Sequence, residues 1–325
     1  MNALFKRAAF AATIAASALS FSALAEKPAE VPSLIKVVVP FAPGAGTDVV
    51  ARAMANLLAD ELDTNVMVEN RPGASGMIGA RAVVNGAKDG SELMVFSSSL
   101  ITTAATLRNM PFDITKDVEP VAMLSEGPMI VVVADPSPIK TPADLIAEAK
   151  AKPGVLNHGT AGTGTLAHMA VELLGEKGGI ALTHIPYRGA APAVVDLIGG
   201  SLDVMVGAYS TFAPVLDSGR ARAIAITTEQ PSPAFPDLPP MATAVPGYDS
   251  GIWIGLWAPQ GLPEELMERL NKAVTNVTHS EEYANILRVD GHQPSHATPA
   301  ELKERVLQDF AAWREVAANA NIVVD

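Results

Sequence analysis

Short apolar runs rich in β-branched residues alternate along the chain with glycine-rich turns and stretches whose apolar residues recur at helical spacing. Residues 35–39 form such a run, which predicts a buried strand that ends at Pro40. A turn at residues 41–46 follows, and Thr47 or Asp48 can cap a helix after it. One face of this helix collects its apolar residues: Val50, Met54, Leu57, Leu58 and Leu62. Because this order of strand, turn and helix recurs, the sequence predicts an α/β fold.

The same patterns predict most of the remaining elements. Further strands are expected at residues 66–68, 92–96, 129–134, 156–158, 184–187, 203–206, 223–227 and 252–257. Helices are expected at residues 165–174, 191–198 and 263–279. Two more should start at Thr141 and Thr298, where a threonine is followed by a proline and then by an acidic residue at the third helical position.

A proline-rich segment separates two parts of this pattern. Prolines 231, 233, 236, 239, 240 and 246 make residues 228–247 extended and stiff. We interpret this segment as a return crossing between two α/β lobes. The first lobe is expected to comprise residues 26–124 and 246–325, and the second residues 125–245. Hinge strands are expected near residues 123–127 and 227–247.

Composition narrows the possible functions of the 325-residue chain. It is 49% hydrophobic and only 18% charged, which excludes a disordered chain. The absence of cysteine excludes disulfides, thiolate metal sites and cysteine nucleophiles. Its net charge of −12 argues against a nucleic-acid binder that neutralises phosphates.

The first 25 residues have the pattern of a secretory signal peptide. Lys6 and Arg7 form a basic start, residues 8–24 are small and apolar, and residues 23–25 supply an A-x-A cleavage motif. The alternative is an uncleaved membrane anchor, but the segment is rich in Ala and Ser rather than Leu and Ile. The sequence therefore predicts cleavage after Ala25 and an exported mature protein.

Two glycine-rich turns between a strand and a helix are candidate binding loops, at residues 44–48 and 159–165. Such turns direct free backbone N–H groups and the positive end of a helix dipole beyond the strand ends, where they can hold a carboxylate or phosphate. Thr160, Thr163 and Thr165 add hydroxyl donors in the second turn. The alternative is that the glycines only permit tight turns. Two such loops in separate lobes favour ligand binding.

Motifs of other site types do not match. The chain has no G-x-G-x-x-G fingerprint at Gly44, no P-loop and no G-x-S-x-G elbow. His292 and His296 are four residues apart, but Pro294 between them argues against a helical metal site. His168 and His184 could face a ligand or serve as hydrogen-bonded structural residues. No nucleophile, base and orienting acid form a trio, so neither an enzyme nor a cofactor nor a metal is expected.

The two turns and their flanks resemble the substrate-binding proteins of tripartite tricarboxylate transporters, the TctC or Bug family. The resemblance runs in order over nearly the whole mature chain. It is carried by residues 38–48 (VVPFAPGAGTD), 68–76 (VENRPGASG), 159–165 (GTAGTGT) with His168, 184–193 (HIPYRGAAPA), 196–203, 246–248 and 255–261.

This resemblance implies a two-lobed periplasmic binding protein of type II, with two crossover strands and hinge closure on a ligand between the lobes. The ligand would be a small organic carboxylate: a di- or tricarboxylate, an amino acid or an aromatic acid. It would be held by loop N–H groups, hydroxyls and ordered water, then delivered to an inner-membrane permease. The ligand-binding residues carried over are Phe41, Ala42, Gly44, Ala45, Gly46, Thr47, Asp48, Ser97, Ser98, Thr160, Ala161, Gly162, Thr163, Gly164, Thr165, His168, Tyr187, Gly189, Ala190 and Asp203.

The chain departs from the family pattern at two places. Many relatives have a double glycine where this chain has Gly44-Ala45-Gly46, and Thr-Asn-Gly where it has Ser97-Ser98-Ser99. The added hydroxyls of Ser98 and Thr102 predict a polar distal end of the ligand. Two other functions stay open, namely a ligand-sensing module for a membrane sensor kinase and, on weaker grounds, an exported hydrolase or isomerase.

Overall fold

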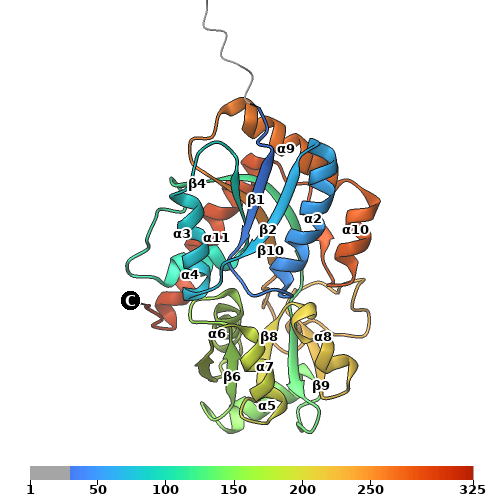
Figure 1. Cartoon of the computed structure of the whole chain (residues 1–325). Coiled ribbons are helices and arrows are strands. Elements are labelled where there is room, and N and C mark those ends of the chain that lie inside the picture. The colour runs from blue at the N-terminus through green and yellow to red at the C-terminus, as the bar shows by residue number, and fades with distance from the viewer. Residues whose placement is uncertain (1–29, 325) are drawn as a thin grey trace, which may run out of the picture. The chain divides into compact units, whose positions relative to one another are not determined.

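The computed structural model describes residues 30–324, so the expected signal peptide lies outside the described residues. The described chain contains a six-stranded and a five-stranded sheet, and Figure 1 shows their strands in separate halves of the ribbon. We call each sheet with its helices a lobe. Two α/β lobes confirm the predicted fold class. Within residues 30–324, no helix has both the length and the apolar character needed to cross a bilayer.

The first sheet has the strand order β11-β4-β10-β3-β1-β2. Its strands are β1 (Leu34–Val39), β2 (Asn65–Asn70), β3 (Glu92–Ser97), β4 (Val118–Gly127), β10 (Ile252–Pro259) and β11 (Gln293–Pro294). Strand β1 pairs in parallel with both β2 and β3, whereas β10 is antiparallel to β3 and β4. The β-branched residues of β1 are buried, as expected for a strand covered on both faces.

The second sheet has the order β7-β6-β8-β5-β9. Its strands are β5 (Ile130–Ala134), β6 (Asn157–Thr160), β7 (Thr183–Pro186), β8 (Val204–Gly207) and β9 (Ala221–Ile226). Strand β6 is parallel to β7 and β8, so these strands end at the same edge of the sheet. Strand β5 is antiparallel to β8 and β9.

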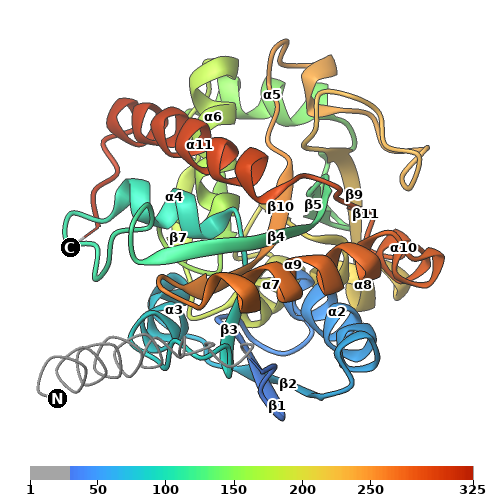
Figure 2. The ribbon, with the colours of Figure 1, turned by 90° about the horizontal axis from the view of Figure 1, so that it is seen from above.

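Helices cover both sheets. Those of the first lobe are α2 (Gly46–Leu62), α3 (Met77–Val84), α4 (Ser99–Thr106), α9 (Glu264–Thr278), α10 (Glu281–Arg288) and α11 (Pro299–Asn319), with the short η1 (Ala74–Gly76). The second lobe has α5 (Pro142–Ala151), α6 (Leu166–Gly178), α7 (Ala190–Ile198) and α8 (Tyr209–Asp217), followed by η2 (Met241–Thr243). Figure 2 shows α11 beside α4 and α6, and all three helices are in contact.

The two predicted capping patterns are present. Thr141 and Thr298 each accept the backbone N–H of the third helical residue, whose carboxylate in turn accepts the N–H of the threonine. The sequence did not predict α3, α4, α8 or α10. The first three have no side-chain cap from their own N-cap residue, so their starts carry no capping signal, whereas Ser280 caps α10.

The chain passes between the lobes at two adjacent positions. Strand β4 leads into β5 through Pro128 and Met129, and the chain returns through Ser250 and Gly251, beside Thr227 at the end of β9. Two hydrogen bonds of 2.9 Å connect Met129 and Thr227. The Thr227 amide donates to the Met129 carbonyl, and the Met129 amide donates to the Thr227 hydroxyl. Ser250 then pairs with Thr227 before β10 begins. The precise lobe boundaries and hinge residues stay predictions.

Candidate ligand-binding cleft

A cavity of about 100 Å³ lies where strands of both sheets end and helices begin. The segments that follow β1, β3, β6 and β8 line it, together with the amino-terminal ends of α2, α4, α6, α7 and α8. Its lining residues are Phe41, Ala45, Gly46, Thr47, Ser97, Ser99, Met129, Thr160, Ala161, Thr165, Leu166, Ala167, Ala190, Met205, Val206, Gly207, Ala208, Thr211, Phe212 and Ile252. Ligands of open α/β sheets bind at such carboxyl edges.

The first glycine-rich turn is held by a carboxylate behind it. Asp48 is buried and accepts hydrogen bonds from the Gly44 N–H, the Arg52 Nε and the Asn70 Nδ2 at 2.8–2.9 Å. Burial alone would raise the pKa of Asp48, but these donors hold it below its ordinary value. Asp48 is therefore a support of the turn, and it is not among the residues that line the cavity.

The first turn of α2 faces the cavity through Gly46 and Thr47. Helix geometry leaves the N–H groups of these residues without intrahelical acceptors. Gly46 also permits a close approach between the lobes, since an added Cβ would lie 2.6 Å from the Cβ of Ala208. A side chain at position 46 would push α8 away.

The second glycine-rich turn is closed on itself by hydroxyls. Thr160 Oγ1 and Thr165 Oγ1 both donate to the Gly162 carbonyl, at 3.1 and 2.8 Å. Gly162 and Gly164 have φ values of +147° and +79°, which favour glycine. The Gly164 N–H donates to His168 Nδ1 at 3.1 Å, so His168 lies behind the turn.

The first lobe contacts this turn directly. Ser75 Oγ donates to the Thr163 carbonyl at 2.9 Å, and Thr103 Oγ1 donates to the Gly164 carbonyl at 3.3 Å. These bonds use the carbonyls of residues 163 and 164 to join the lobes rather than to bind a ligand. The cavity-facing positions of the turn are Thr160, Ala161 and Thr165.

The serines at the end of β3 differ in where their side chains lie, since some line the cavity and others are buried in the core. Ser97 and Ser99 line the cavity. Ser98 accepts a long 3.4 Å contact from the Trp253 N–H, and Thr102 donates to the Ser99 carbonyl at 3.2 Å. Ser98 and Thr102 are both buried and are not among the lining residues, so the polar distal end expected from their hydroxyls stays a prediction.

Apolar side chains form most of the cavity wall. Met129, Met205, Phe212, Ile252 and Phe41 contribute from both lobes. The polar groups are hydroxyls, and none of the lining residues is Asp, Glu, Lys, Arg or His. Any anion held here would therefore rely on hydroxyls, N–H groups and helix dipoles.

The structure brings part of the predicted set together at this cavity and places the rest around it. Residues of the set that line the cavity are Phe41, Ala45, Gly46, Thr47, Ser97, Thr160, Ala161, Thr165 and Ala190. Residues that support the turns from outside the lining are Ala42, Gly44, Asp48, Ser98, Gly162, Thr163, Gly164, His168 and Gly189. Their predicted role in binding stays a prediction.

Two residues of the predicted set lie away from the cavity. The carboxylate of Asp203 accepts the Asn157 N–H at 2.7 Å, at the amino-terminal ends of β6 and β8. The cavity lies at the opposite ends of these strands. Tyr187 donates its hydroxyl to Asp196 at 2.6 Å, within the same segment. For both residues the structure shows a local structural contact instead of a cavity-facing position.

The sequence analysis missed the end of β8 and the start of α8 as parts of the cavity wall. Residues 205–208, Thr211 and Phe212 line the cavity, as do Met129, Leu166, Ala167 and Ile252. The one available signal was Gly207, which follows a predicted strand. No cap residue marks the helix after it, because its N-cap is Ala208.

Three histidines lie together behind the second turn. The ring centroids of His168 and His184 are 3.7 Å apart, and His158 lies 4.9 Å from His184. Burial, followed by the charge of His168, lowers the pKa of His184 to about 3. Burial, then the other two histidines, lowers the pKa of His158 well below its ordinary value. The rings of His158 and His184 are therefore neutral at pH 7, and His184 Nε2 bonds Thr160 Oγ1 at 2.6 Å.

His158, His168 and Glu172 have potential metal-ligand atoms within 4.8 Å of one another. The hydrogen bonds of His168 argue against a shared ion. Its Nδ1 accepts from Gly164, so in the neutral ring Nε2 carries the proton and faces Glu172 at 3.4 Å. A metal would have to displace this proton, whereas ligating histidines normally donate their other N–H.

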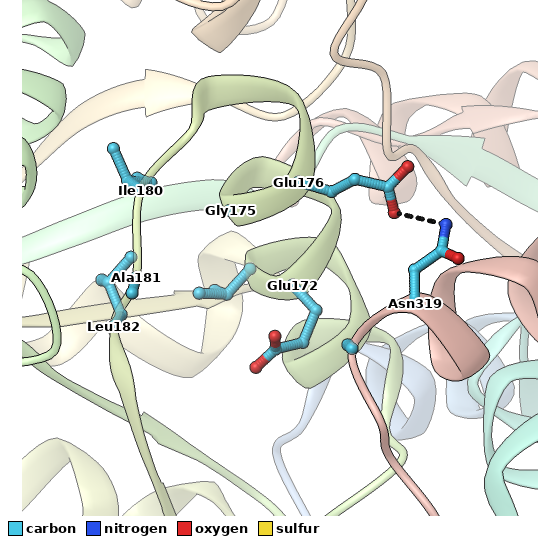
Figure 3. A pocket seen from close by; sticks show the side chains of 9 residues that line it. Glu172, Gly175, Glu176, Ile180, Ala181, Leu182 and Asn319 are labelled. Atoms are coloured by element: carbon cyan, nitrogen blue, oxygen red, sulfur yellow. Dashed lines mark hydrogen bonds between the residues drawn. The ribbon is translucent and has the colours of Figure 1, made fainter.

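A separate pocket of about 300 Å³ lies between α6 and the end of α11. Figure 3 shows Glu176 of α6 reaching Asn319 of α11, with which it forms a 3.3 Å hydrogen bond, while Glu172 points away from Asn319. The pocket also contains Gly175 and residues 180–182. None of the predicted site residues lines it, so it carries no argument about the glycine-rich turns.

Known proteins resemble this chain over most of its length. Residues 50–321 match the family described as tripartite tricarboxylate transporter family receptor. The protein BugT of Bordetella pertussis is 33% identical over 87% of this chain and 87% of its own length. The R. palustris protein Rpa4515, solved with adipate, has a TM-score of 0.84 at 31% identity and covers 89% of this chain and 98% of its own. MatC of Rhodopseudomonas palustris, solved with bound malate, has a TM-score of 0.80 at 30% identity. It covers 87% of this chain and 98% of its own length.

Proposed function

Because the chain belongs to the tripartite tricarboxylate transporter receptor family, we propose that it is a periplasmic solute-binding protein for a small carboxylate. The carboxylate is captured in the cavity between the lobes and delivered to an inner-membrane permease. The observation that carries this proposal is the convergence of helix starts on a cavity without charged lining residues. The function is binding and release, with no covalent step.

Helix starts explain how an acidic protein can hold an anion. The net charge of the chain is −12, so the long-range field does not attract a carboxylate. The amino terminus of each helix carries about half a positive charge and free N–H donors. The ends of α2 and α7, through Gly46 and Ala190, offer such donors from opposite lobes. A carboxylate between them is stabilised only when the lobes are together.

The apolar wall supports an aliphatic body for the ligand. Met129, Met205, Phe212 and Ile252 offer no partner to a hydroxyl group of the ligand, whereas the hydroxyl side chains of the lining lie at strand ends, in the turns and at helix starts. An unpaired buried hydroxyl costs roughly 1–3 kcal/mol. Rpa4515 was solved with adipate, an unsubstituted chain, and MatC with malate, which bears a hydroxyl. We therefore expect this protein to prefer an unsubstituted carboxylate such as adipate over a hydroxylated one such as malate.

The predicted targeting and lobe boundaries belong to this proposal. Residues 1–25 would direct export and be removed after Ala25. Residues 26–124 with 246–325 would form one rigid body and residues 125–245 the other. The crossings beside Met129 and Thr227 support a hinge at these positions, since two single strands are easily bent.

Thermal unfolding of the mature protein with a ligand panel tests the proposal. The panel contains adipate, malate, an amino acid, an aromatic acid, a sugar and a nucleotide. A carboxylate at 100 times its Kd stabilises the fold by about 2.7 kcal/mol, which raises the Tm by several degrees. Stabilisation by adipate above malate supports the proposal. Stabilisation by the sugar or the nucleotide alone would overturn it.

A further inference from the structure

The turn that follows α10 in the first lobe contacts the start of α8 in the second lobe. Asp290 of this turn is 2% exposed. Its Oδ1 accepts the backbone N–H of Ser210 at 2.5 Å, and its Oδ2 accepts the Ser210 hydroxyl at 3.1 Å. Ser210 is 80 positions away in the chain. A single carboxylate thus forms two hydrogen bonds between the lobes.

These two bonds have the form of a helix cap supplied from outside the helix. Helix α8 begins at Tyr209, and its N-cap residue Ala208 has no side-chain acceptor. An N-cap Asp, Asn, Ser or Thr normally accepts the N–H of the second or third helical residue. Ser210 is the second residue of α8, so Asp290 occupies the acceptor position that Ala208 leaves open.

The capped end of α8 is also a wall of the cavity. Ala208, Thr211 and Phe212 line it, on either side of Ser210. Opposite them is Gly46, where an added Cβ would lie 2.6 Å from Ala208 Cβ and 3.1 Å from Asp290 Oδ2. The cap, the first turn of α2 and the start of α8 therefore meet at one point beside the ligand cavity.

The neighbouring residues of the same turn reinforce this contact. Gly291 has a φ of +74°, and an added Cβ would lie only 2.1 Å from the ring of Phe235 in the second lobe. Phe235 in turn packs against Tyr209, with ring centroids 5.5 Å apart. His292 Nδ1 bonds Ser125 Oγ at 3.1 Å on β4, the strand that crosses to the second lobe. Residues 290–292 thus contact α8, Phe235 and the crossing strand.

We propose that Asp290 is a positioning residue that holds the cleft closed by capping α8 from the opposite lobe. This inference rests on the proposed function, in which the lobes separate to admit and release the ligand. Opening the cleft separates Asp290 from α8, so the Ser210 N–H bonds water instead of the carboxylate. Closing it restores both bonds and brings the starts of α2 and α8 to the cavity. Burial, opposed by the bonds from Ser210, raises the pKa of Asp290 to about 6, which indicates a desolvated position.

The test measures the distance between the lobes independently of ligand binding. The chain has no cysteine, so Met67→Cys and Val195→Cys, at exposed positions on β2 and α7, permit a specific pair of spin labels. Double electron–electron resonance then gives the distribution of distances between the labels, and from it the fractions of closed and open protein, with and without adipate. We expect Asp290→Ala to lower the closed-to-open ratio about tenfold and to weaken adipate binding by a similar factor. Asp290→Asn keeps one acceptor and should have a smaller effect.

Ser280→Ala is the matched control. Ser280 caps α10 within the first lobe by accepting the Tyr283 N–H at 3.2 Å. Its loss should lower the Tm without changing the distances between the labels. If Asp290→Ala lowers the Tm but leaves the distances and the affinity unchanged, Asp290 has only a structural role and the inference is overturned. If the distances shift but no carboxylate binds the wild type, the proposed function fails while the cap stands.

Discussion

The hydroxyl of Ser99 accepts the backbone N–H of Leu166 at 3.1 Å, so a residue at the start of α4 caps the first amide of α6 in the other lobe. The N-cap of α6, Thr165, instead directs its hydroxyl to the Gly162 carbonyl. Helices α6 and α8 both therefore begin with an acceptor from the first lobe. In the proposed closure of the lobes, these two helix starts are completed when the lobes come together.

Ser99→Ala should weaken carboxylate binding more than it weakens the fold. The substitution leaves the Leu166 N–H without its acceptor in the closed form, which costs about 1 kcal/mol. The affinity for adipate is therefore expected to fall about fivefold, as measured by titration calorimetry. Ser33→Ala, at an exposed position, is the control and should bind as the wild type does. Equal affinities for the two variants would show that this bond contributes nothing to closure.

Gly46→Ala should block closure. The new methyl group would overlap the Cβ of Ala208 at 2.6 Å, and neither backbone can move aside without separating α2 from α8. We expect the affinity for adipate to fall more than tenfold while the circular dichroism spectrum is unchanged. Gly251→Ala is the matched control, since its added Cβ meets nothing closer than 3.4 Å. Wild-type affinity in Gly46→Ala would mean that the lobes bind ligand without this close approach.

The sequence predicted the two glycine-rich turns because their signals are local. Gly162 and Gly164 occupy conformations with positive φ, and the threonines around them close the turn, so residue types and geometry coincide. Most of the strands were predictable for the same reason, from β-branched runs such as residues 35–39, but β11 and the first part of β4 were not predicted. The alternation of these elements was enough to identify the α/β class, and the two lobes were predicted from the proline-rich segment 228–247 and the family resemblance.

The missed parts depend on contacts between distant residues. Helix α8 starts at an alanine N-cap because its acceptor is Asp290, and no local pattern reports such a pair. Ser98 and Ser99 are adjacent in the sequence, yet Ser99 faces the cavity and Ser98 faces Trp253. Their directions depend on how α4 packs. Asp203 was assigned by resemblance to a matching stretch, but it lies at the start of β8, whereas the cavity lies at the end of that strand.

Asp48→Asn should destabilise the protein through the first turn. The amide keeps one acceptor oxygen but can no longer accept from Gly44, Arg52 and Asn70 together. Hydrogen bonds to charged groups contribute roughly 1.5–3 kcal/mol each, and we expect a net loss of about 2 kcal/mol. Urea unfolding measures it directly. Asp60→Asn, at an exposed position of the same helix, should change the stability by less than about 0.5 kcal/mol.

The histidine cluster should make the protein sensitive to mild acid. The pKa of His184 is lowered to about 3 and that of His158 also lies well below its ordinary value, whereas histidine in an unfolded chain titrates near 6.5. The unfolded chain therefore binds more protons below pH 6.5. Stability is fully present above that pH and falls as the pH drops toward 3. Each of the two rings contributes a slope of at most about 1.4 kcal/mol per pH unit.

His158→Phe separates this effect from general acid unfolding. In the described part of the chain, both ring nitrogens of His158 are buried without a hydrogen-bond partner, so a phenyl ring loses no bond. Between pH 7 and pH 5 the wild type should lose stability through both His158 and His184, whereas the variant should lose only the share of His184, about 2 kcal/mol. Urea unfolding at the two pH values measures the difference, and His296→Gln, at an exposed position, should keep the wild-type loss. If His158→Phe loses as much as the wild type, His158 is not the buried neutral group that its surroundings indicate.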